Sequence, residues 1–468
     1  MEDPTRARSG KPRRQPRHAS YVAPKYVSPG LERVREVAKE DAGLRFTNLL
    51  HHISEQLLEQ AYEALNPKAS AGVDEMTWAE YGKGLKVRLK DLHERVHRGS
   101  YRAKPSLRTY IPKADGRMRP LGIASLEDKI VQMATVWVLQ AIYEEDFLGF
   151  SYGFRPGRSQ HQALDAIWVA IMNRKVNWVL DADIRGFFDH VSHEWLEKFV
   201  AHRVGDQRVL RLIHKWLKAG VSEDGQWSST VVGTPQGATI SPLLANVYLH
   251  YVLDLWVDAW RTRHARGEVY IVRYADDFVM GFQYQDDAER FRKELERRLG
   301  SFGLELHAEK TRLIEFGRFA AGNRAKRGEG KPETYDFLGF THICGKRRKD
   351  GKFTVLRKTI AKRMRMKAKA VAAELMRRRH EPVPAQGRWL RAVIRGHYQY
   401  YAVPGNFTAL NRFANMLTRA WLHALRRRSH MARKLTWARM RTYIDRWIPS
   451  PRILHPYPNT RLVVTHPR

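Results

Sequence analysis

Hydrophobic residues recur every three or four positions through much of the chain, which is the spacing of amphipathic helices. The clearest helical stretches are residues 44–65, 85–97, 126–146, 159–173, 193–203, 241–260 and 286–301. Short runs rich in β-branched and aromatic residues lie between them and are typical of strands. These runs are residues 109–113, 177–184, 267–275, 277–282 and 311–316. Helices and strands intermixed in this order predict an α+β region from about 108 to 340.

The pattern changes toward both ends of the chain. From residue 355 onward it is helical, with apolar residues on one stripe and Lys or Arg over much of the remaining surface. The first 40 residues are polar, basic and contain several prolines, which is typical of a mobile segment. The pattern divides the chain into a basic flexible leader, a helical extension, the α+β region, a helical region and a basic tail. Their expected limits are 1–44, 45–107, 108–340, 341–430 and 431–468.

The formal charge of +34 is spread unevenly. Residues 341–468 hold 31 Lys and Arg against 4 Asp and Glu, a net charge of +27, whereas the first 340 residues carry +7. A charge block of this size repels itself unless it meets a polyanion, and solubility alone needs only a few units of charge. The composition therefore predicts a nucleic-acid partner held through its phosphates.

Cysteine content and hydropathy exclude several classes of protein. A single cysteine, Cys344, rules out a disulfide framework or a zinc site built on cysteine pairs within the chain. No apolar run approaches the ~18 residues of a membrane span. The basic N-terminus is not followed by the apolar run of a secretory signal. We therefore expect a cytoplasmic protein with no membrane partner.

Two acids, Asp276 and Asp277, lie side by side at the tip of a predicted hairpin in IVRYADDFVMGF. A third and a fourth, Asp181 and Asp183, share one face of the strand predicted at 177–184, because side chains alternate along a strand. Phosphoryl and nucleotidyl transfer require carboxylates that converge on metal ions, usually Mg²⁺. A solvated turn for the adjacent pair, and a capping or surface position for Asp181, remain open from these residues alone.

Seven blocks in order resemble the reverse transcriptase–maturase proteins encoded by bacterial group II introns. They are RTYIPKADGRMRPLGIASLEDKIVQ (108–132), SYGFRPGRSQHQAL (151–164), DADIRGFFDHVSH (181–193), GTPQGATISPLLANVYLHYVLD (233–254), YADD (274–277), GLELHAEKT (303–311) and YDFLGF (335–340). The resemblance implies a right-hand polymerase. Its fingers and palm would occupy residues 108–340 after a helical fingers extension, and an all-helical thumb and maturase region would follow.

The resemblance also implies the catalytic residues. Asp183, Asp276 and Asp277 would bind two Mg²⁺ ions, with the backbone carbonyl of Ile184 as a further ligand. In the family pattern the ligand is the acid followed by Ile-Arg-Gly or Ile-Lys-Gly, which selects Asp183 over Asp181.

The residues implied to bind the nucleotide come from several blocks. They are Lys113, Arg117, Arg119, Phe188, Gln236, Gly237 and Lys310. The arginines and Lys113 would meet the triphosphate or the template, because guanidinium groups chelate phosphate oxygens. Phe188 would lie under the sugar and exclude a 2′-hydroxyl. Lys310 matches a lysine proposed to protonate pyrophosphate, and an anchoring contact with the backbone is the alternative.

The C-terminal region contains WLRAVIRGHYQYYAVPGN (389–406), which resembles the maturase signature. The expected RNA-binding residues are Arg363, Lys367, Arg391, Arg395, His397, Tyr398 and Tyr400. Cations would contact phosphates and aromatic rings would stack on unpaired bases. A core helix with at least one tyrosine packed inward is the alternative.

The predicted function is RNA-directed DNA synthesis, combined with binding of the parent group II intron RNA to assist splicing and intron mobility by target-primed reverse transcription. The expected partners are the intron RNA, an RNA template with a DNA primer or target DNA, and dNTPs. No segment resembles the cysteine-containing nuclease of many relatives, so we expect that nuclease to be absent. Two alternatives stay open: a splicing factor without polymerase activity, and a domesticated reverse transcriptase in DNA repair or phage defence. The oligomeric state is open.

Overall fold

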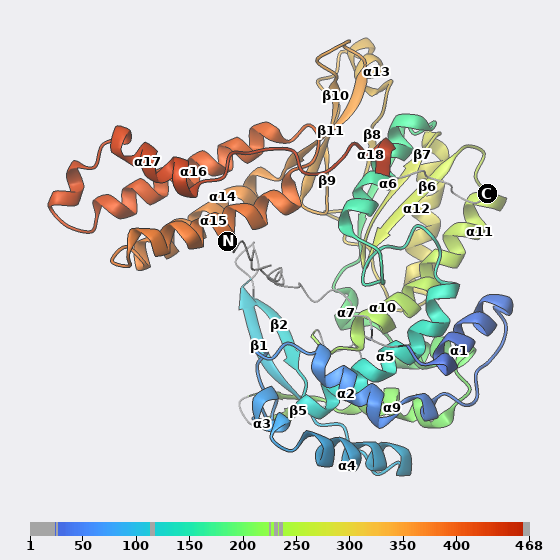
Figure 1. Cartoon of the computed structure of the whole chain (residues 1–468). Coiled ribbons are helices and arrows are strands. Elements are labelled where there is room, and N and C mark those ends of the chain that lie inside the picture. The colour runs from blue at the N-terminus through green and yellow to red at the C-terminus, as the bar shows by residue number, and fades with distance from the viewer. Residues whose placement is uncertain are drawn as a thin grey trace, which may run out of the picture.

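The computed structural model describes residues 24, 27–112, 118–223, 226–228, 233 and 237–461. Three parts follow one another in Figure 1: a helix-rich fingers part with a small sheet, a palm with a four-stranded sheet, and an extended bundle of helices. The predicted α+β fold, with a helical region after it, is confirmed.

The palm sheet has the strand order β6-β7-β3-β8, and every neighbouring pair is antiparallel. Its strands are β3 (Trp178–Asp183), β6 (Val269–Tyr274), β7 (Asp277–Phe282) and β8 (Arg312–Glu315). The helices around it are α6 (Gln160–Asn173), α7 (Phe187–His190), α8 (His193–Arg203), α10 (Ser241–Leu249), α11 (Leu255–Arg263), α12 (Gln285–Gly300) and α13 (Ala320–Lys326). Between α10 and α11 the chain makes one π-helical segment, His250–Asp254.

Helices cover both faces of the palm sheet, so its strands are apolar on both sides. Val179, Val272 and Val279 belong to the apolar cluster that includes α6. Leu180 and Met280, on the opposite face, belong to the larger cluster that includes α12. This alternation fixes which side chains of β3 and β7 lie beneath each helix.

The fingers sheet has the order β2-β1-β4-β5. Its strands are β1 (Ser106–Pro112), β2 (Met118–Ile123), β4 (Val221–Glu223) and β5 (Gln226–Ser228). The helices of this part are α1 (Pro29–Glu40), α2 (Glu55–Ala64), α3 (Trp78–Gly82), α4 (Leu85–Arg98), α5 (Leu126–Asp146) and α9 (Gln207–Lys218), with a 3-10 turn at Leu50–His52.

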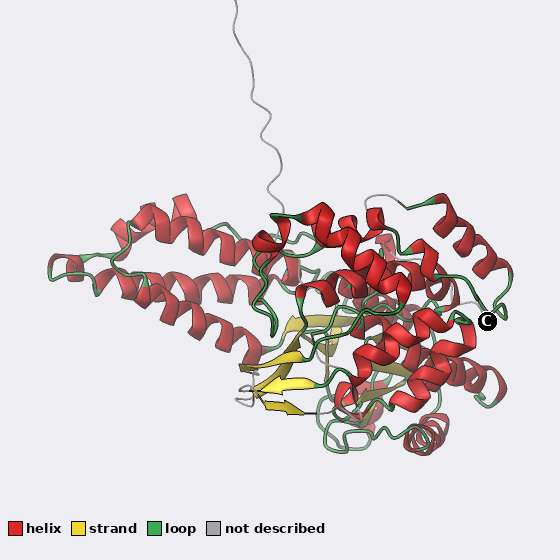
Figure 2. Ribbon diagram, turned by 90° about the horizontal axis from the view of Figure 1, so that it is seen from below, coloured by secondary structure: helices red, strands yellow, loops and turns green. Residues whose placement is uncertain are grey.

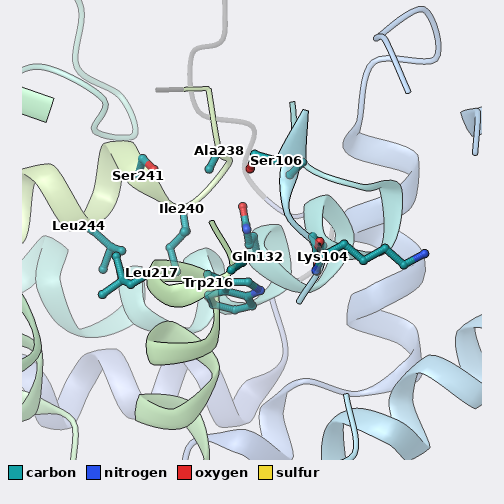
Figure 3. Close-up of a pocket in the computed structure, with 12 residues that line it drawn as sticks. Lys104, Ser106, Gln132, Trp216, Leu217, Ala238, Ile240, Ser241 and Leu244 are labelled. Atoms are coloured by element: carbon teal, nitrogen blue, oxygen red, sulfur yellow. Dashed lines mark hydrogen bonds between the residues drawn. The ribbon is translucent and has the colours of Figure 1, made fainter. Parts of the chain in front are cut away.

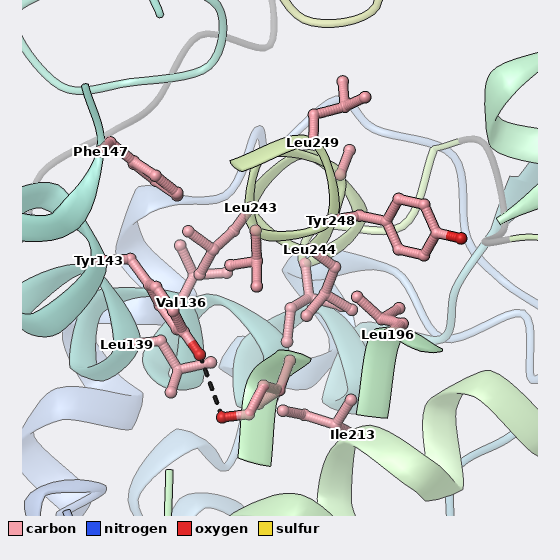
Figure 4. Packing of buried hydrophobic residues seen from close by; sticks show 14 of the residues in the cluster. Val136, Leu139, Tyr143, Phe147, Leu196, Ile213, Leu243, Leu244, Tyr248 and Leu249 are labelled. Atoms are coloured by element: carbon pink, nitrogen blue, oxygen red, sulfur yellow. Dashed lines mark hydrogen bonds between the residues drawn. The ribbon is translucent and has the colours of Figure 1, made fainter. Parts of the chain in front are cut away.

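Helix α5 is the centre of the main core (Figure 4). Val136, Leu139 and Tyr143 of α5 lie beside Leu243 and Leu244 of α10, all of them buried. The buried Tyr143 hydroxyl donates to the Val200 carbonyl oxygen at 3.2 Å, so this phenol does not lose its hydrogen bond inside the core. The same core therefore joins the fingers helices to the palm.

The thumb begins with a three-stranded sheet in the order β11-β10-β9. Its strands are β9 (Tyr335–Phe337), β10 (Phe340–Lys346) and β11 (Phe353–Thr359), and its helices are α14 (Ala361–Arg377), α15 (Val383–Tyr401), α16 (Phe407–Arg426) and α17 (Trp437–Trp447), with a 3-10 turn at Met431–Lys434. The bundle projects away from the rest of the molecule in both views (Figures 1 and 2). The chain then returns to the palm, where α18 (Pro458–Arg461) packs on α6.

The structure differs from the character predicted for three parts of the chain. Within the leader predicted at 1–44, residues 29–40 form α1, which buries Leu31 and Ala38 and packs on α5. The helical region expected from 355 begins only after β11. The tail predicted at 431–468 is folded over its described part, because α17 buries Met440 and Trp447 in the thumb core.

Among the described residues, no helix is long and apolar enough to cross a membrane.

Candidate active site

The register of the palm sheet brings three carboxylates to one end. Asp183, the last residue of β3, lies directly opposite Asp277, the first residue of β7. Asp277 is also paired with Tyr274 of β6, so Ala275 and Asp276 alone form the turn between the two strands. Residues almost a hundred positions apart in the sequence thus meet at the hairpin tip.

Charge repulsion and burial mark these acids as a cation site. Burial raises the pKa of Asp276, and Asp183 adds to this, while Arg119 and Arg273 oppose it. The Asp277 side chain reaches solvent, yet the surrounding protein and then the carboxylates of Asp276 and Asp183 raise its pKa to about 7. A cation bound between these groups would relieve the repulsion.

The two acids of β3 have different partners. Asp181 lies 3.8 Å from the Arg312 guanidinium, and burial raises its pKa to about 6 against that charge. Asp183 instead forms a salt bridge with Lys310, whose Nζ lies 2.5 Å from the carboxylate. The structure therefore places Asp183, and not Asp181, opposite the hairpin acid, and its present counter-ion is a lysine.

The donor set suits a divalent metal, although no group of three His, Cys, Asp or Glu side chains among the described residues is already assembled to hold one. Three carboxylates offer the hard oxygen ligands that Mg²⁺ and Mn²⁺ prefer. Two backbone hydrogen bonds flank Ile184: the His307 amide donates to the Asp183 carbonyl, and the Arg185 amide donates to the Glu305 carbonyl, at 2.8 Å each. The Ile184 carbonyl takes no part in that pairing, which is compatible with the predicted ligand.

Comparison with known proteins agrees with this site. A family model described as reverse transcriptase (RNA-dependent DNA polymerase) matches residues 111–342. Protein YkfC of Escherichia coli is 36% identical over 315 residues, which cover 59% of this chain and 81% of YkfC. The chain belongs to the reverse transcriptase family. The predicted membership is thereby confirmed.

Other similar proteins are intron-encoded. The group II intron-encoded protein LtrA of Lactococcus lactis is 35% identical over 231 residues, 48% of this chain and 38% of LtrA. An uncharacterized 91 kDa protein in the cob intron of Schizosaccharomyces pombe is 44% identical over 154 residues, 33% of this chain and 19% of that protein. The alignments with this chain thus cover most of the length of YkfC but well under half of the length of LtrA and of the cob intron protein.

The structure places four of the predicted nucleotide-binding residues and leaves three outside the described residues. Lys113, Arg117 and Gln236 are those three. Phe188 is half-buried and meets the buried Phe187 edge to face at 5.3 Å. Arg119 lies on the fingers strand β2 of this reverse transcriptase, and its charge opposes the rise in the pKa of Asp276.

Gly237 has a positive φ of 110°, and a Cβ there would lie 2.8 Å from the Gly122 carbonyl oxygen. Only glycine suits this position without strain. Behind it lies a cavity of about 10 Å³, lined by Gln132, Trp216, Ala238 and their neighbours (Figure 3). Gln132 accepts a hydrogen bond from the Thr239 amide at 3.0 Å. A space of this size holds at most about one water, so it is too small to be a nucleotide pocket.

Four of the predicted RNA-binding residues point into the protein. Tyr398 is 3% exposed and donates to the Pro449 carbonyl at 3.3 Å. Tyr400 donates to the Leu338 carbonyl at 2.8 Å, and His397 stacks on Phe413 at 3.7 Å. The Arg391 guanidinium donates to the Arg446 and Trp447 carbonyls.

The prediction that Tyr398 stacks on RNA bases is wrong, because its ring belongs to the thumb core. The hydroxyl of Tyr400 and the guanidinium of Arg391 are likewise used inside the protein. Arg363, Lys367 and Arg395 are exposed, as a phosphate-binding role requires. Arg363 also acts on the pKa of Asp277 in the lowering direction, so α14 approaches the catalytic end of the palm.

The sequence interpretation missed Arg273. It is a charged residue in the apolar strand β6, where an arginine is costly to bury unless it is fully paired. That contrast was the signal in the sequence for a buried polar network.

Proposed function

We propose that this reverse transcriptase extends DNA on an RNA template by using Asp183, Asp276 and Asp277 to hold two Mg²⁺ ions. The observation that supports this most directly is the pairing of Asp183 with Asp277 beside Asp276. Bound metal would stabilise the charge that develops on the attacking and departing oxygens. The dNTPs, the primer and the template are the expected substrates.

Cations from three parts of the chain act electrostatically on the acids. Arg119 comes from the fingers, Arg363 from the thumb helix α14 and Lys310 from the palm. In the proposed reaction the arginines attract the triphosphate and the template. Lys310, which now neutralises Asp183, is placed to offset charge on the pyrophosphate or to give it a proton.

Phe188 is proposed to select deoxynucleotides by filling the space that a 2′-hydroxyl needs. It lies five positions beyond Asp183, on the short helix α7, and its ring is not fully enclosed by the core. Gln236 and Gly237 are proposed to line the same nucleotide site, with Lys113 and Arg117 reaching it from the fingers.

We further propose that the protein binds a group II intron RNA, assists its splicing by selecting its folded form and supports its mobility. The name of LtrA and the charge of +27 over residues 341–468 support this. Exposed Arg363, Lys367 and Arg395 would contact RNA phosphates.

Primer extension on an RNA template tests the polymerase. DNA should form with Mg²⁺ and dNTPs, and a chelator should stop it. An in vitro splicing assay with the intron that flanks the gene tests the second activity. Synthesis without any effect on splicing would favour the repair or defence alternative, and splicing without synthesis would favour a pure splicing factor.

A further inference from the structure

Arg273 is a fully buried arginine whose guanidinium contacts the catalytic turn. Its Nη1 donates to the carbonyl oxygen of Ala275 at 3.0 Å and to Asn246 Oδ1 at 3.1 Å. Its Nη2 donates to Ser151 Oγ at 2.7 Å. Nε and Nη2 together grip the carboxylate of Asp254, with Nε at 2.7 Å from Oδ1. Every partner is itself buried.

Two of the partners of Arg273 come from a helix with an irregular turn. Asn246 lies on α10, and Asp254 is the last residue of the π-helical segment His250–Asp254. A π-turn inserts an extra residue and rotates the side chains that follow it, and such turns are frequent at functional sites. Here the residue that ends the turn is the acid that holds the arginine.

The loop before α6 also contacts the end of β6 and the turn between β6 and β7. The Tyr152 amide donates to the Arg273 carbonyl, and the Arg273 amide donates to the Phe150 carbonyl, at 2.9 Å each. Asn246 Nδ2 donates to the Gly153 carbonyl at 2.7 Å. A Cβ on Gly153 would lie 2.3 Å from the Ala275 amide nitrogen, so this loop touches the turn backbone directly.

The turn itself requires support. Ala275 has a positive φ of 58°, a backbone conformation that is unfavourable for a residue with a Cβ. Residues in such conformations persist where their surroundings hold them, and they cluster at active sites. The hydrogen bond from Arg273 to the Ala275 carbonyl holds this strained residue between Tyr274 and Asp276.

We propose that Arg273 is a positioning residue that fixes the catalytic turn, so that Asp276 and Asp277 are held ready for divalent metal. The proposal rests on the assignment of the metal site above. The buried Arg273–Asp254 pair is oriented by Asn246 and Ser151, and it acts on the acids through the backbone of Ala275. Partners that orient metal ligands typically contribute 10–100-fold to metal affinity or activity.

The chain supplies a matched control in Arg357. It is also buried, at 2% exposed, and pairs with the buried Asp165 at 2.8 Å. That pair joins β11 to α6. Arg357→Lys therefore reports the general cost of disturbing a buried arginine in this protein.

The test measures Mn²⁺ binding to the full-length free protein by electron paramagnetic resonance, together with thermal unfolding and the Mg²⁺ concentration for half-maximal primer extension. Arg273→Lys and Ser151→Ala should weaken Mn²⁺ binding and raise the Mg²⁺ requirement, by roughly tenfold or more for Arg273→Lys. Ser151→Ala removes one hydroxyl only, so it keeps the test available if Arg273→Lys does not fold. Arg357→Lys should lower the unfolding temperature without changing the Mn²⁺ affinity or the Mg²⁺ concentration for half-maximal extension.

Two failures are distinguishable. The positioning role of Arg273 would be overturned if Arg273→Lys and Ser151→Ala had the same Mn²⁺ affinity and the same Mg²⁺ requirement as Arg357→Lys. Mn²⁺ binding in the wild-type protein that does not depend on Asp183 would instead overturn the metal site, and with it the proposed function.

Discussion

Two aspartates on one face of β3, Asp181 and Asp183, differ at the scale of single residues in the cation that each one meets. The sequence places Asp181 and Asp183 on the same face through strand alternation, and the resemblance selects Asp183. The ion pair between Asp181 and Arg312 was not predictable, because β8 lies some 130 positions away in the sequence. The partner of Lys310 was not predictable for the same reason.

Phe188 provides a prediction about the sugar. Phe188→Ala should open space near the nucleotide and raise incorporation of ribonucleotides relative to deoxynucleotides, by roughly tenfold if one steric contact of ~1.4 kcal/mol is removed. Single-nucleotide primer extension with matched rNTP and dNTP measures the ratio. Phe187→Ala is the control, since Phe187 is buried and should cost stability alone. An unchanged ratio in Phe188→Ala would show that this ring also serves only in packing.

His342 provides a prediction about pH. It is fully buried and stacked on Tyr335 at 4.5 Å, and burial followed by the charge of Arg357 lowers its pKa to about 3. From pH 6.5 down to about 3, the histidine of the unfolded chain binds a proton that the native protein does not. The free energy of unfolding therefore decreases as the pH falls, by up to ~1.4 kcal/mol per pH unit. His342→Phe should reduce the loss of urea resistance between pH 7.5 and pH 5. An equal loss in both proteins would assign the acid sensitivity to other groups.

At the scale of elements, the four palm strands were easier to predict than the ends of the chain. The strand predicted at 277–282 is β7 itself, and the helix predicted at 126–146 is α5, because long buried elements carry strong hydrophobic patterns. Helices α1 and α17 were assigned to a leader and a tail. Each is rich in charge and exposes most of its surface, so only its contact with α5 or α15 decides that it folds.

The thumb helix α15 provides a prediction that separates stability from RNA binding. Tyr398→Ala should destabilise the thumb by roughly 3–5 kcal/mol, as truncation of a buried aromatic ring does. Its binding to cognate and random RNA, measured below the unfolding temperature, should stay the same. Arg395→Ala should behave in the opposite way, with unchanged thermal unfolding and weaker binding to both RNAs. Selective loss of cognate RNA binding in Tyr398→Ala, without loss of stability, would restore base stacking by this tyrosine.

At the scale of the whole molecule, charge is divided between two tasks. The first 340 residues carry +7 and contain the acids proposed to be catalytic, whereas residues 341–468 carry +27. Composition alone predicted a polyanion partner for the second part, and the comparisons place the chain in a family that works on nucleic acid. The effect of Arg363 on Asp277 was not predictable, because it depends on the tertiary arrangement of the thumb relative to the palm.

The charge division predicts a steep salt dependence. With about eight phosphate contacts, RNA affinity should fall roughly a thousandfold between about 50 and 200 mM salt. Neutral substitution of Arg363, Lys367 and Arg395 together should flatten the slope of log affinity against log salt by roughly two to three units. Filter binding over a salt series measures both slopes. A shallow wild-type slope would contradict the thumb as a phosphate-binding surface.

We propose that Asp183, and not the nearby Asp181, completes the carboxylate set at the tip of the β6–β7 hairpin. The most direct test is primer extension on an RNA template by Asp183→Asn and Asp181→Asn, with RNA affinity and thermal unfolding measured on the same samples. We predict that Asp183→Asn lowers the rate by orders of magnitude with RNA affinity unchanged, and that Asp181→Asn retains most of the rate. Near-normal synthesis by Asp183→Asn, or an equal loss in Asp181→Asn, would contradict this assignment.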